Sequence, residues 1–154
     1  FFEDRLVMQY QIQEMLKAEK IFEADGIQEE LDAYNPLIPD GTNWKATMMI
    51  QYSDVTERQR MLARLVGIEN QVWLRVGDHD KVYPIADEDL ERATEDKTSA
   101  VHFLRFELTP AMIADAHKGA TLSAGAEHEN YSVNVDAIPD NVAESLVQDL
   151  QSIQ

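Results

Sequence analysis

Two stretches of the chain, residues 45–85 and 100–138, run through the same order of predicted elements: strand, capped helix, glycine, strand, turn and strand. Residue identity between the stretches is poor, so their likeness is one of organisation, which fits either an internal duplication or two ordinary α+β units. Two β-α-β-β units predict an α+β fold with one largely antiparallel sheet of about six strands. The aligned landmarks are Asp54 with Thr109, Gly67 with Gly119, and His79 with His128.

Local signals mark the helix boundaries in both stretches. Asp54 followed by Glu57 has the pattern of a capping box, so we expect a helix from Val55 that ends before Gly67. In the second stretch, Thr109-Pro110 is an N-cap followed by proline at the first helical position. The strands are expected at residues 45–52, 71–76, 81–85, 100–108, 121–126 and 132–138, and the acidic connector 86–98 is expected to hold at most two exposed helical turns.

Helices are expected at both ends of the chain. Residues 5–22 contain neither glycine nor proline, and one helical face carries an apolar stripe that includes the carboxylate Glu19. We expect this helix to be the longest and to lie against one face of the sheet. A short helix is expected to follow and to stop near Asn35, because a proline comes next, and a last helix is expected from Pro139. The stripe consists of Met8, Ile12, Met15, Glu19 and Phe22, and the last helix carries Val142, Leu146, Leu150 and Ile153.

Length and composition limit the class of protein. The 154 residues are expected to form one domain, because a chain of this size buries about 68–70% of its unfolded surface. The net charge of −16 argues against binding nucleic acid or an acidic membrane surface. The sequence has no cysteine, which excludes disulfides, zinc–thiolate sites and iron–sulfur ligation by this chain. A cytoplasmic location is expected, because the sequence shows neither a signal peptide nor a long apolar run. A segment preceding Phe1 is also expected, because the chain does not start with Met.

Both expected hairpin tips place a histidine between two acids, and the candidate ligands are Asp78, His79, Glu127 and His128. Imidazole and carboxylate groups suit Zn, Mn or Fe, so these residues predict a metal site if the two tips meet. The alternative is that tight turns select polar residues for backbone reasons, and that the histidines face solvent. His102 is on the core face of the strand 100–108, and we expect it to be buried with its hydrogen bonds satisfied.

Four polar residues of the first helix are candidates for contacting a protein partner: Arg5, Gln11, Glu14 and Glu19. The alternative is that Glu14 pairs with Lys17 at the surface and that Glu19 bonds to Arg5 or to a strand. The Glu-x-x-His motif of di-iron sites is absent from the sequence. Neither a glycine-rich phosphate loop nor a nucleophile elbow occurs, so the sequence favours a protein without catalytic activity over an enzyme.

Three functions from different classes are compatible with these residues. The first is an accessory protein that docks on a partner through residues 1–22 and the adjacent loops. The second is a small metal-binding protein or metal-dependent enzyme that uses the hairpin-tip histidines. The third is a small-molecule site in the sheet concavity, lined by Tyr10, Trp44 and Tyr52. A homo-oligomer is compatible with each of them.

Four long and idiosyncratic segments cover most of the chain: FFEDRLVMQYQIQEMLKAEKIF, ELDAYNPLIPDGTNWKATMMI, RLVGIENQVWLRVGDHDKVYPIADEDLER and TSAVHFLRFELTPAMI. They resemble a bacterial family of uncharacterised proteins, a domain of unknown function. The resemblance implies a further N-terminal segment rich in Arg and Lys. It supplies no catalytic residues, and no cofactor is expected for this chain.

The same resemblance implies a biological setting. Genes of the family are often found beside those for rubrerythrin and for an iron–sulfur oxidoreductase resembling heterodisulfide reductase subunits. An accessory role in peroxide or redox metabolism, with a redox protein as partner, is therefore implied. The absence of cysteine agrees with a protein that assists a cluster-bearing partner without holding a cluster itself.

Overall fold

The computed structural model describes residues 2–151, and its first sheet is built on the central strand β5 (Val101–Glu107). This strand is rich in aromatic and branched residues, which favour strands. It pairs antiparallel with β2 (Asn43–Met49) over seven positions, from Asn43 opposite Glu107 to Met49 opposite Val101. The short strands β1 (Phe2–Glu3) and β4 (Ile85–Ala86) form the two edges, in the order β1-β2-β5-β4.

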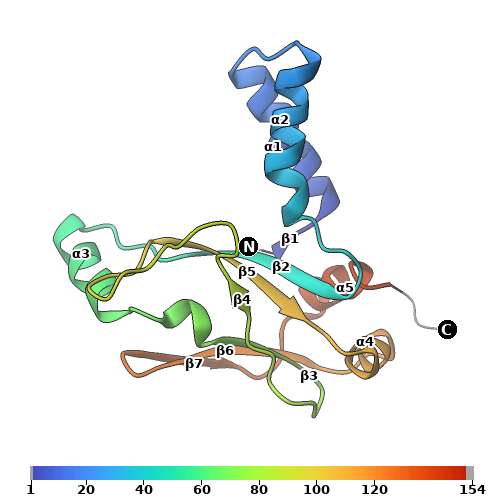
Figure 1. Ribbon diagram of the computed structural model, residues 1–154. Helices are drawn as coiled ribbons and strands as arrows, with labels where there is room; N and C mark the ends of the chain where they lie inside the picture. Colours follow the sequence, from blue (N-terminus) through green and yellow to red (C-terminus); the bar gives the residue numbers. More distant parts are fainter. Residues whose placement is uncertain (1, 152–154) are drawn as a thin grey trace.

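A second, three-stranded sheet packs against the first, with the core between them (Figure 1). Its strands β3 (Val72–Val76), β6 (Leu122–His128) and β7 (Tyr131–Val135) are antiparallel in that order. All strand pairings in both sheets are antiparallel, which confirms the predicted α+β class. The predicted single sheet of about six strands is wrong, because β2 and β5 pair with each other but not with β3 or β6.

The described chain contains five α-helices and two short 3-10 helices. Capping signals placed the starts of the helices after Asp54 and Thr109 correctly: the Asp54 side chain accepts hydrogen bonds from the backbone N–H groups of Thr56 and Glu57, and Thr109 accepts from Met112. Gly67 has the left-handed φ of 87° that a helix C-terminus favours. The helices are α1 (Arg5–Ala18), α2 (Ala24–Tyr34), η1 (Asn35–Leu37), α3 (Val55–Arg64), η2 (Ile68–Asn70), α4 (Pro110–His117) and α5 (Asp140–Gln148).

The hydrophobic core lies between the two sheets and the helices α4 and α5. Strand alternation directs Trp44 and Phe106 into it from the first sheet and Val76 from the second. Trp44 is 2% exposed, and its indole Nε1 donates to the carbonyl oxygen of Leu146 on α5 at 2.8 Å. This bond satisfies the polar atom of the buried ring and ties the last helix to the first sheet.

The segment 81–85 does not form the returning strand that the sequence predicted. Val82 makes a single antiparallel bridge to Leu74, and the chain then crosses to pair Ile85 and Ala86 with β5. Pro84 explains the change, because proline has no N–H to donate to a strand ladder. The strands that begin the two similar stretches, β2 and β5, pair with each other, and so do β3 and β6. The internal duplication itself stays a prediction.

The N-terminal helices form a hairpin that projects away from both sheets (Figure 1). The expectation that residues 5–22 lie against the sheet is therefore wrong. The helix ends at Ala18, since Lys20 adopts a left-handed φ of 54°, and the chain then returns as α2. Met8 and Ile12 are buried, α1 contacts α2 and η1, and Glu19 and Phe22 are exposed beyond the helix. The buried residues of the stripe thus pack inside the hairpin rather than against the sheet.

Two further expectations concern the connector and the ends of the chain. Residues 87–98 contain no helix and run as irregular chain with one bridge, between Ala93 and Thr98. Phe1, which belonged to the expected docking segment, and Ile153, which belonged to the expected last helix, lie outside the described residues.

Within residues 2–151, none of the helices has the length and apolar character needed to cross a membrane.

Candidate functional site

The α1–α2 hairpin carries the most exposed large apolar side chains of the described chain. Leu6 is 74% exposed and Tyr10, one helical turn further on, is 63% exposed. Val7 between them is 45% exposed, and Phe22, in the turn between α1 and α2, is 83% exposed. We call Leu6, Val7 and Tyr10 the α1 face. Single exposed apolar residues are ordinary, but a group on one projecting element is a feature of interaction surfaces.

Packing inside the hairpin leaves the α1 face without a partner. Met8 and Ile12 are 4% and 7% exposed, and Ile12 shares a small cavity with Leu31 of α2. Leu6 and Tyr10 are each two residues from one of these buried positions, which is a rotation of about 200° around a helix with 3.6 residues per turn. The α1 face therefore points away from α2.

The four predicted partner-contact residues all belong to this hairpin. Arg5 is the first residue of α1 and is exposed, while Gln11 is half-buried. Glu14 is exposed one turn after Tyr10, so it borders the α1 face. Glu19 is exposed at the C-cap of α1 and forms no ion pair within residues 2–151, so the pairing with Arg5 that the sequence offered as an alternative is not formed.

The hairpin is also strongly acidic. Residues 4–34 contain eight Asp and Glu against three Lys and Arg, a net charge of −5. The N-cap Asp4 uses its carboxylate to accept the Val7 N–H at 2.7 Å. Six of the eight acids are at residue 19 or later, in the turn and on α2. A hairpin of this net charge is complementary to a partner surface that carries Lys and Arg.

The predicted metal ligand His79 is engaged by the neighbouring helix. Its Nε2 lies 2.7 Å from Oδ2 of Asp115 on α4. The carbonyl oxygen of His79 accepts a hydrogen bond from Nε of Arg75 at 2.7 Å, and that of Asp78 accepts from the same guanidinium at 3.4 Å. These contacts fasten the turn after β3 to α4, while the Asp78 side chain is exposed.

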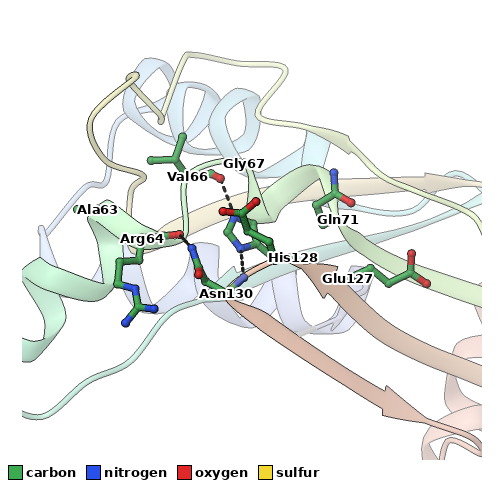
Figure 2. A pocket seen from close by; sticks show the side chains of 9 residues that line it. Ala63, Arg64, Val66, Gly67, Gln71, Glu127, His128 and Asn130 are labelled. Carbon is green, nitrogen blue, oxygen red and sulfur yellow. Dashed lines mark hydrogen bonds between the residues drawn. The ribbon is translucent and has the colours of Figure 1, made fainter.

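His128 fastens the β6–β7 turn to the end of α3 (Figure 2). Its Nε2 donates to the carbonyl oxygen of Val66 at 2.8 Å, and its Nδ1 accepts the N–H of Asn130 at 3.0 Å. The side chain of Asn130 donates to the carbonyl oxygen of Arg64 at 2.8 Å. Because a carbonyl only accepts and an N–H only donates, both ring nitrogens are committed to the backbone. Neither is left to bind a metal.

Glu127 points away from His128 (Figure 2), and its partners belong to the segment after β3. Its carboxylate is ion-paired with Lys81 and accepts the hydroxyl of Tyr83 at 3.0 Å. Hydrogen bonds from Lys81 and Tyr83 lower the pKa of Glu127 below its usual value. Lys81 also lies over the Trp73 ring, 4.5 Å from its centroid.

The structure does not bring the two tip histidines together. His79 follows Val76, which pairs with Leu122 at the start of β6, whereas His128 is at the end of the same strand. Seven residues of strand separate those positions by about 20 Å. Within residues 2–151, no cluster of three or more His, Asp or Glu side chains has the geometry of a metal site. The expected shared metal site is not formed.

A buried polar network surrounds His102, which is 0% exposed. Nδ1 lies 2.5 Å from Oδ2 of Asp87, and Nε2 lies 2.7 Å from the hydroxyl of Thr98 and 3.0 Å from the carbonyl oxygen of Ser99. The other oxygen of Asp87 accepts the N–H of Phe103 at 2.9 Å. The sequence prediction of a buried histidine with satisfied hydrogen bonds is confirmed.

The order Asp87, His102, Thr98 resembles the hydrogen-bond order of a nucleophilic triad. Thr98 is 1% exposed, however, so its hydroxyl is closed to a substrate. Its N–H donates to the carbonyl oxygen of Leu62 on α3 at 2.9 Å. The network therefore binds the irregular connector to β5 and α3, and its role is structural.

Sequence reasoning missed the partners of His102. Strand alternation placed the His102 ring in the core, where both ring nitrogens need hydrogen-bond partners. A polar partner from another part of the chain, such as an acid, was therefore to be expected. The connector offers six acids, and the choice of Asp87 depends on its left-handed φ of 52°. Arg92 extends the network: it binds Asp87 at 3.2 Å and both carboxylate oxygens of Asp89, and it lowers the pKa of Asp89 to about 2.

A cleft of about 820 Å³ lies between the foot of the hairpin and the outer face of the first sheet. Tyr34 and Leu37 line one side, and Phe103 lines the other. Lys45 crosses it to donate to the carbonyl oxygen of Pro36 at 2.7 Å, joining the hairpin foot to β2. The volume is that of a small-molecule site.

The predicted concavity lined by Tyr10, Trp44 and Tyr52 is not formed. Trp44 is in the core, and Tyr10 is on the projecting helix α1. Tyr52 follows β2 in the loop before α3. The expectation failed because it assumed that α1 covers the sheet.

Two antiparallel sheets, a projecting helical hairpin and a closed polar network define an α+β protein. The chain belongs to the family described as protein of unknown function (DUF3501), whose model matches residues 1–150. The resemblance that the sequence suggested is thereby confirmed at the level of the family.

A solved bacterial structure supports the same fold. It is the 1.90 Å crystal structure of a novel protein of unknown function from Burkholderia pseudomallei K96243. The two chains are 58% identical with a TM-score of 0.90, and the similarity covers 98% of this chain and 78% of that chain. No curated protein matches the sequence.

Proposed function

We propose that this chain is a cytoplasmic accessory protein that docks on a redox protein through the α1–α2 hairpin. The observation that carries the proposal is the α1 face, an exposed apolar group on an element that projects from the fold. The partner is an iron–sulfur oxidoreductase of the kind that the family resemblance implies, with rubrerythrin as the second candidate. The protein has no cysteine, so the partner holds any cluster.

The α1 face has the composition of a binding hot spot. Tyrosine is among the residues that contribute most to interfaces, and Tyr10 is 63% exposed. Burying a side chain such as Leu6 or Tyr10 against a partner is worth about 1.5–3 kcal/mol each. Two such contacts are enough to change a dissociation constant by about a hundredfold or more.

The charge of the hairpin specifies the kind of surface it fits. Its net charge of −5 favours a partner surface that carries Lys and Arg, and the exposed Glu14 is the acid that borders the α1 face. Because such exposed charges are screened by salt, we expect association to slow as ionic strength rises. The buried contacts of the α1 face are expected to set the dissociation rate.

Binding of the purified proteins tests this proposal. We expect the wild-type chain to bind the iron–sulfur oxidoreductase, and the double variant L6E/Y10E to bind at least about tenfold more weakly in isothermal titration calorimetry. Val55→Glu is the matched control, because Val55 is a 53% exposed apolar residue of α3, outside the hairpin. Circular dichroism checks that each variant is folded.

Two outcomes would overturn the proposal. One is no complex between the wild-type chain and either the oxidoreductase or rubrerythrin at about 100 µM, a concentration at which even weak complexes form. The other is equal loss of binding in Val55→Glu and L6E/Y10E, which would place the contact outside the hairpin. Tighter binding to rubrerythrin than to the oxidoreductase would make rubrerythrin the first candidate for the partner.

A further inference from the structure

Strand β7 is an open edge of the second sheet. Within the described chain, β6 is its single hydrogen-bonded neighbour, and all five of its residues are exposed. The other edges are less available: β1 and β4 have two residues each, and β3 is bridged by Val82 on its free side. An edge strand of five residues presents a row of unpaired backbone groups that accept another strand.

The usual devices that protect an edge strand are missing from β7. Its sequence, Tyr-Ser-Val-Asn-Val, contains no lysine, no proline and no charge, in a chain whose net charge is −16. Its register with β6 runs without a bulge from Tyr131 opposite His128 to Val135 opposite Ala124. Proteins that avoid edge-to-edge pairing use charges, prolines or bulges at such positions.

One face of β7 is apolar and uncovered. The register places Tyr131, Val133 and Val135 on the side of the sheet that carries the buried residue Ala126 and faces the core. Their exposed fractions are 48%, 42% and 42%, so the core ends before it reaches this strand. The other face carries Ser132 and Asn134 and is polar.

We infer that β7 pairs with β7 of a second copy of this chain, antiparallel about a two-fold axis at Val133. The two three-stranded sheets then join into one six-stranded sheet with the order β3-β6-β7-β7-β6-β3. Tyr131 of one copy faces Val135 of the other, Ser132 faces Asn134, and Val133 faces itself. Apolar residues therefore meet apolar residues on one face and polar residues meet polar residues on the other.

The charges next to β7 favour a second copy over an unrelated strand. In the register centred on Val133, Glu129 of one copy is opposite Ala137 of the other, and Asn130 is opposite Asp136. No acid faces an acid, although two copies of a chain with net charge −16 repel each other on most of their surfaces. An isologous contact needs this kind of self-complementary patch.

Solution mass tests the inference. A ladder of five residues is a small interface, so we expect reversible dimers with dissociation in the micromolar range. Sedimentation equilibrium of the wild-type chain is expected to approach twice the mass of 17.5 kDa at about 300 µM and to fall toward one chain at about 1 µM. Val133→Lys is expected to stay at the mass of one chain throughout, and the control Val55→Lys, at an exposed site on α3, to behave as wild type.

Hydrogen exchange keeps the test decisive if Val133→Lys fails to fold. In the wild-type chain we expect the amides of β7 to exchange at least about fivefold more slowly at 300 µM than at 1 µM, while those of β5 are unchanged. A wild-type chain that stays at 17.5 kDa at about 300 µM would overturn the inference. So would a dimer whose β7 amides exchange at the same rate at both concentrations.

Discussion

Asp149 caps the C-terminal end of α5, where burial and the nearby charge of Asp4 raise its pKa from 3.8 to about 6. Between these two pH values the folded chain binds a proton that the unfolded chain has released, so stability falls as the pH rises through this window. We expect Asp149→Asn to match wild type below pH 3.8 and to be more stable above pH 6. Urea unfolding at about pH 4 and about pH 7 measures the difference.

The control for Asp149 is an acid at the other end of the same helix. Asp140 is exposed in the first turn of α5, where a negative charge is favourable. Asp140→Asn is therefore expected to leave stability unchanged or to lower it slightly at neutral pH. A constant stability difference between Asp149→Asn and wild type at both pH values would contradict the assignment.

A second prediction for a single residue concerns His102. Removing its ring leaves the carboxylate of Asp87 without its closest partner, with its side chain 9% exposed. Breaking such a buried pair costs about 3–5 kcal/mol, so we expect His102→Ala to lose about that much of its free energy of unfolding. His117→Ala is the control, because the exposed His117 ring makes one hydrogen bond, to the carbonyl oxygen of Gln151.

Urea unfolding measures both histidine variants. We expect His117→Ala to lose less than about 1 kcal/mol, the net value of one exposed hydrogen bond. If His102→Ala does not fold, His102→Gln retains one donor and is expected to fold with intermediate stability. Equal losses in the variants of His102 and His117 would show that the network does not hold the connector in place.

Single residues were predictable where the cause lay within a few positions of the chain. The caps Asp54 and Thr109 and the left-handed Gly67 follow from local backbone chemistry, and the structure has all three. The pairing of His102 with Asp87 was not predictable. It spans 15 residues of irregular chain, and its choice among several acids depends on packing that no local pattern encodes.

At the scale of elements, the hairpin is expected to be the least stable part of the described fold. Its buried side chains are few, with Met8 and Ile12 as the fully buried residues of α1 and none in α2. Isolated helices of this length are marginal in water, so the hairpin depends on these contacts. We expect amides of α1 and α2 to exchange hydrogen by local opening, at a lower free energy than amides of β5.

Truncation of one side chain sharpens that prediction. Met8→Ala is expected to accelerate exchange throughout α1 and α2 by about tenfold or more and to leave β5 unchanged, because a cavity there costs about 2–5 kcal/mol locally. Met49→Ala, at a 40% exposed site on β2, is the control and is expected to change neither region. Equal acceleration in the hairpin and β5 would mean that they unfold together.

The type of each element was more predictable than its partners. Alternation and turn chemistry identified β2, β5, β6 and β7 with ends off by at most three residues, which is within the usual uncertainty of predicted element ends. The division into two sheets was missed because strand order depends on long-range pairing. Pro84 is a sequence signal that argues against a full strand over residues 81–85.

At the scale of the whole molecule, opposing effects of charge determine the response to salt. The chain has 29 acidic and 13 basic residues, so repulsion among acids works against the compact state. Specific pairs work the other way: Arg105 binds both carboxylate oxygens of Glu88 at 2.7 and 2.9 Å. These pairs are exposed, and exposed pairs contribute about 0–1 kcal/mol each. Repulsion at net charge −16 is expected to exceed them.

We therefore expect salt to stabilise the protein at neutral pH. Raising KCl from 0.01 M to 1 M shortens the Debye length from about 30 Å to about 3 Å, which screens repulsion across the whole surface. The midpoint of thermal unfolding at pH 7 is expected to rise by several degrees, since about 1 kcal/mol corresponds to about 2–4 °C for a chain of this size. Near the sequence pI of 4.4 the net charge vanishes, so the rise is expected to disappear. A midpoint that falls with KCl at pH 7 would show that the ion pairs of Arg105 and Arg92 outweigh the repulsion.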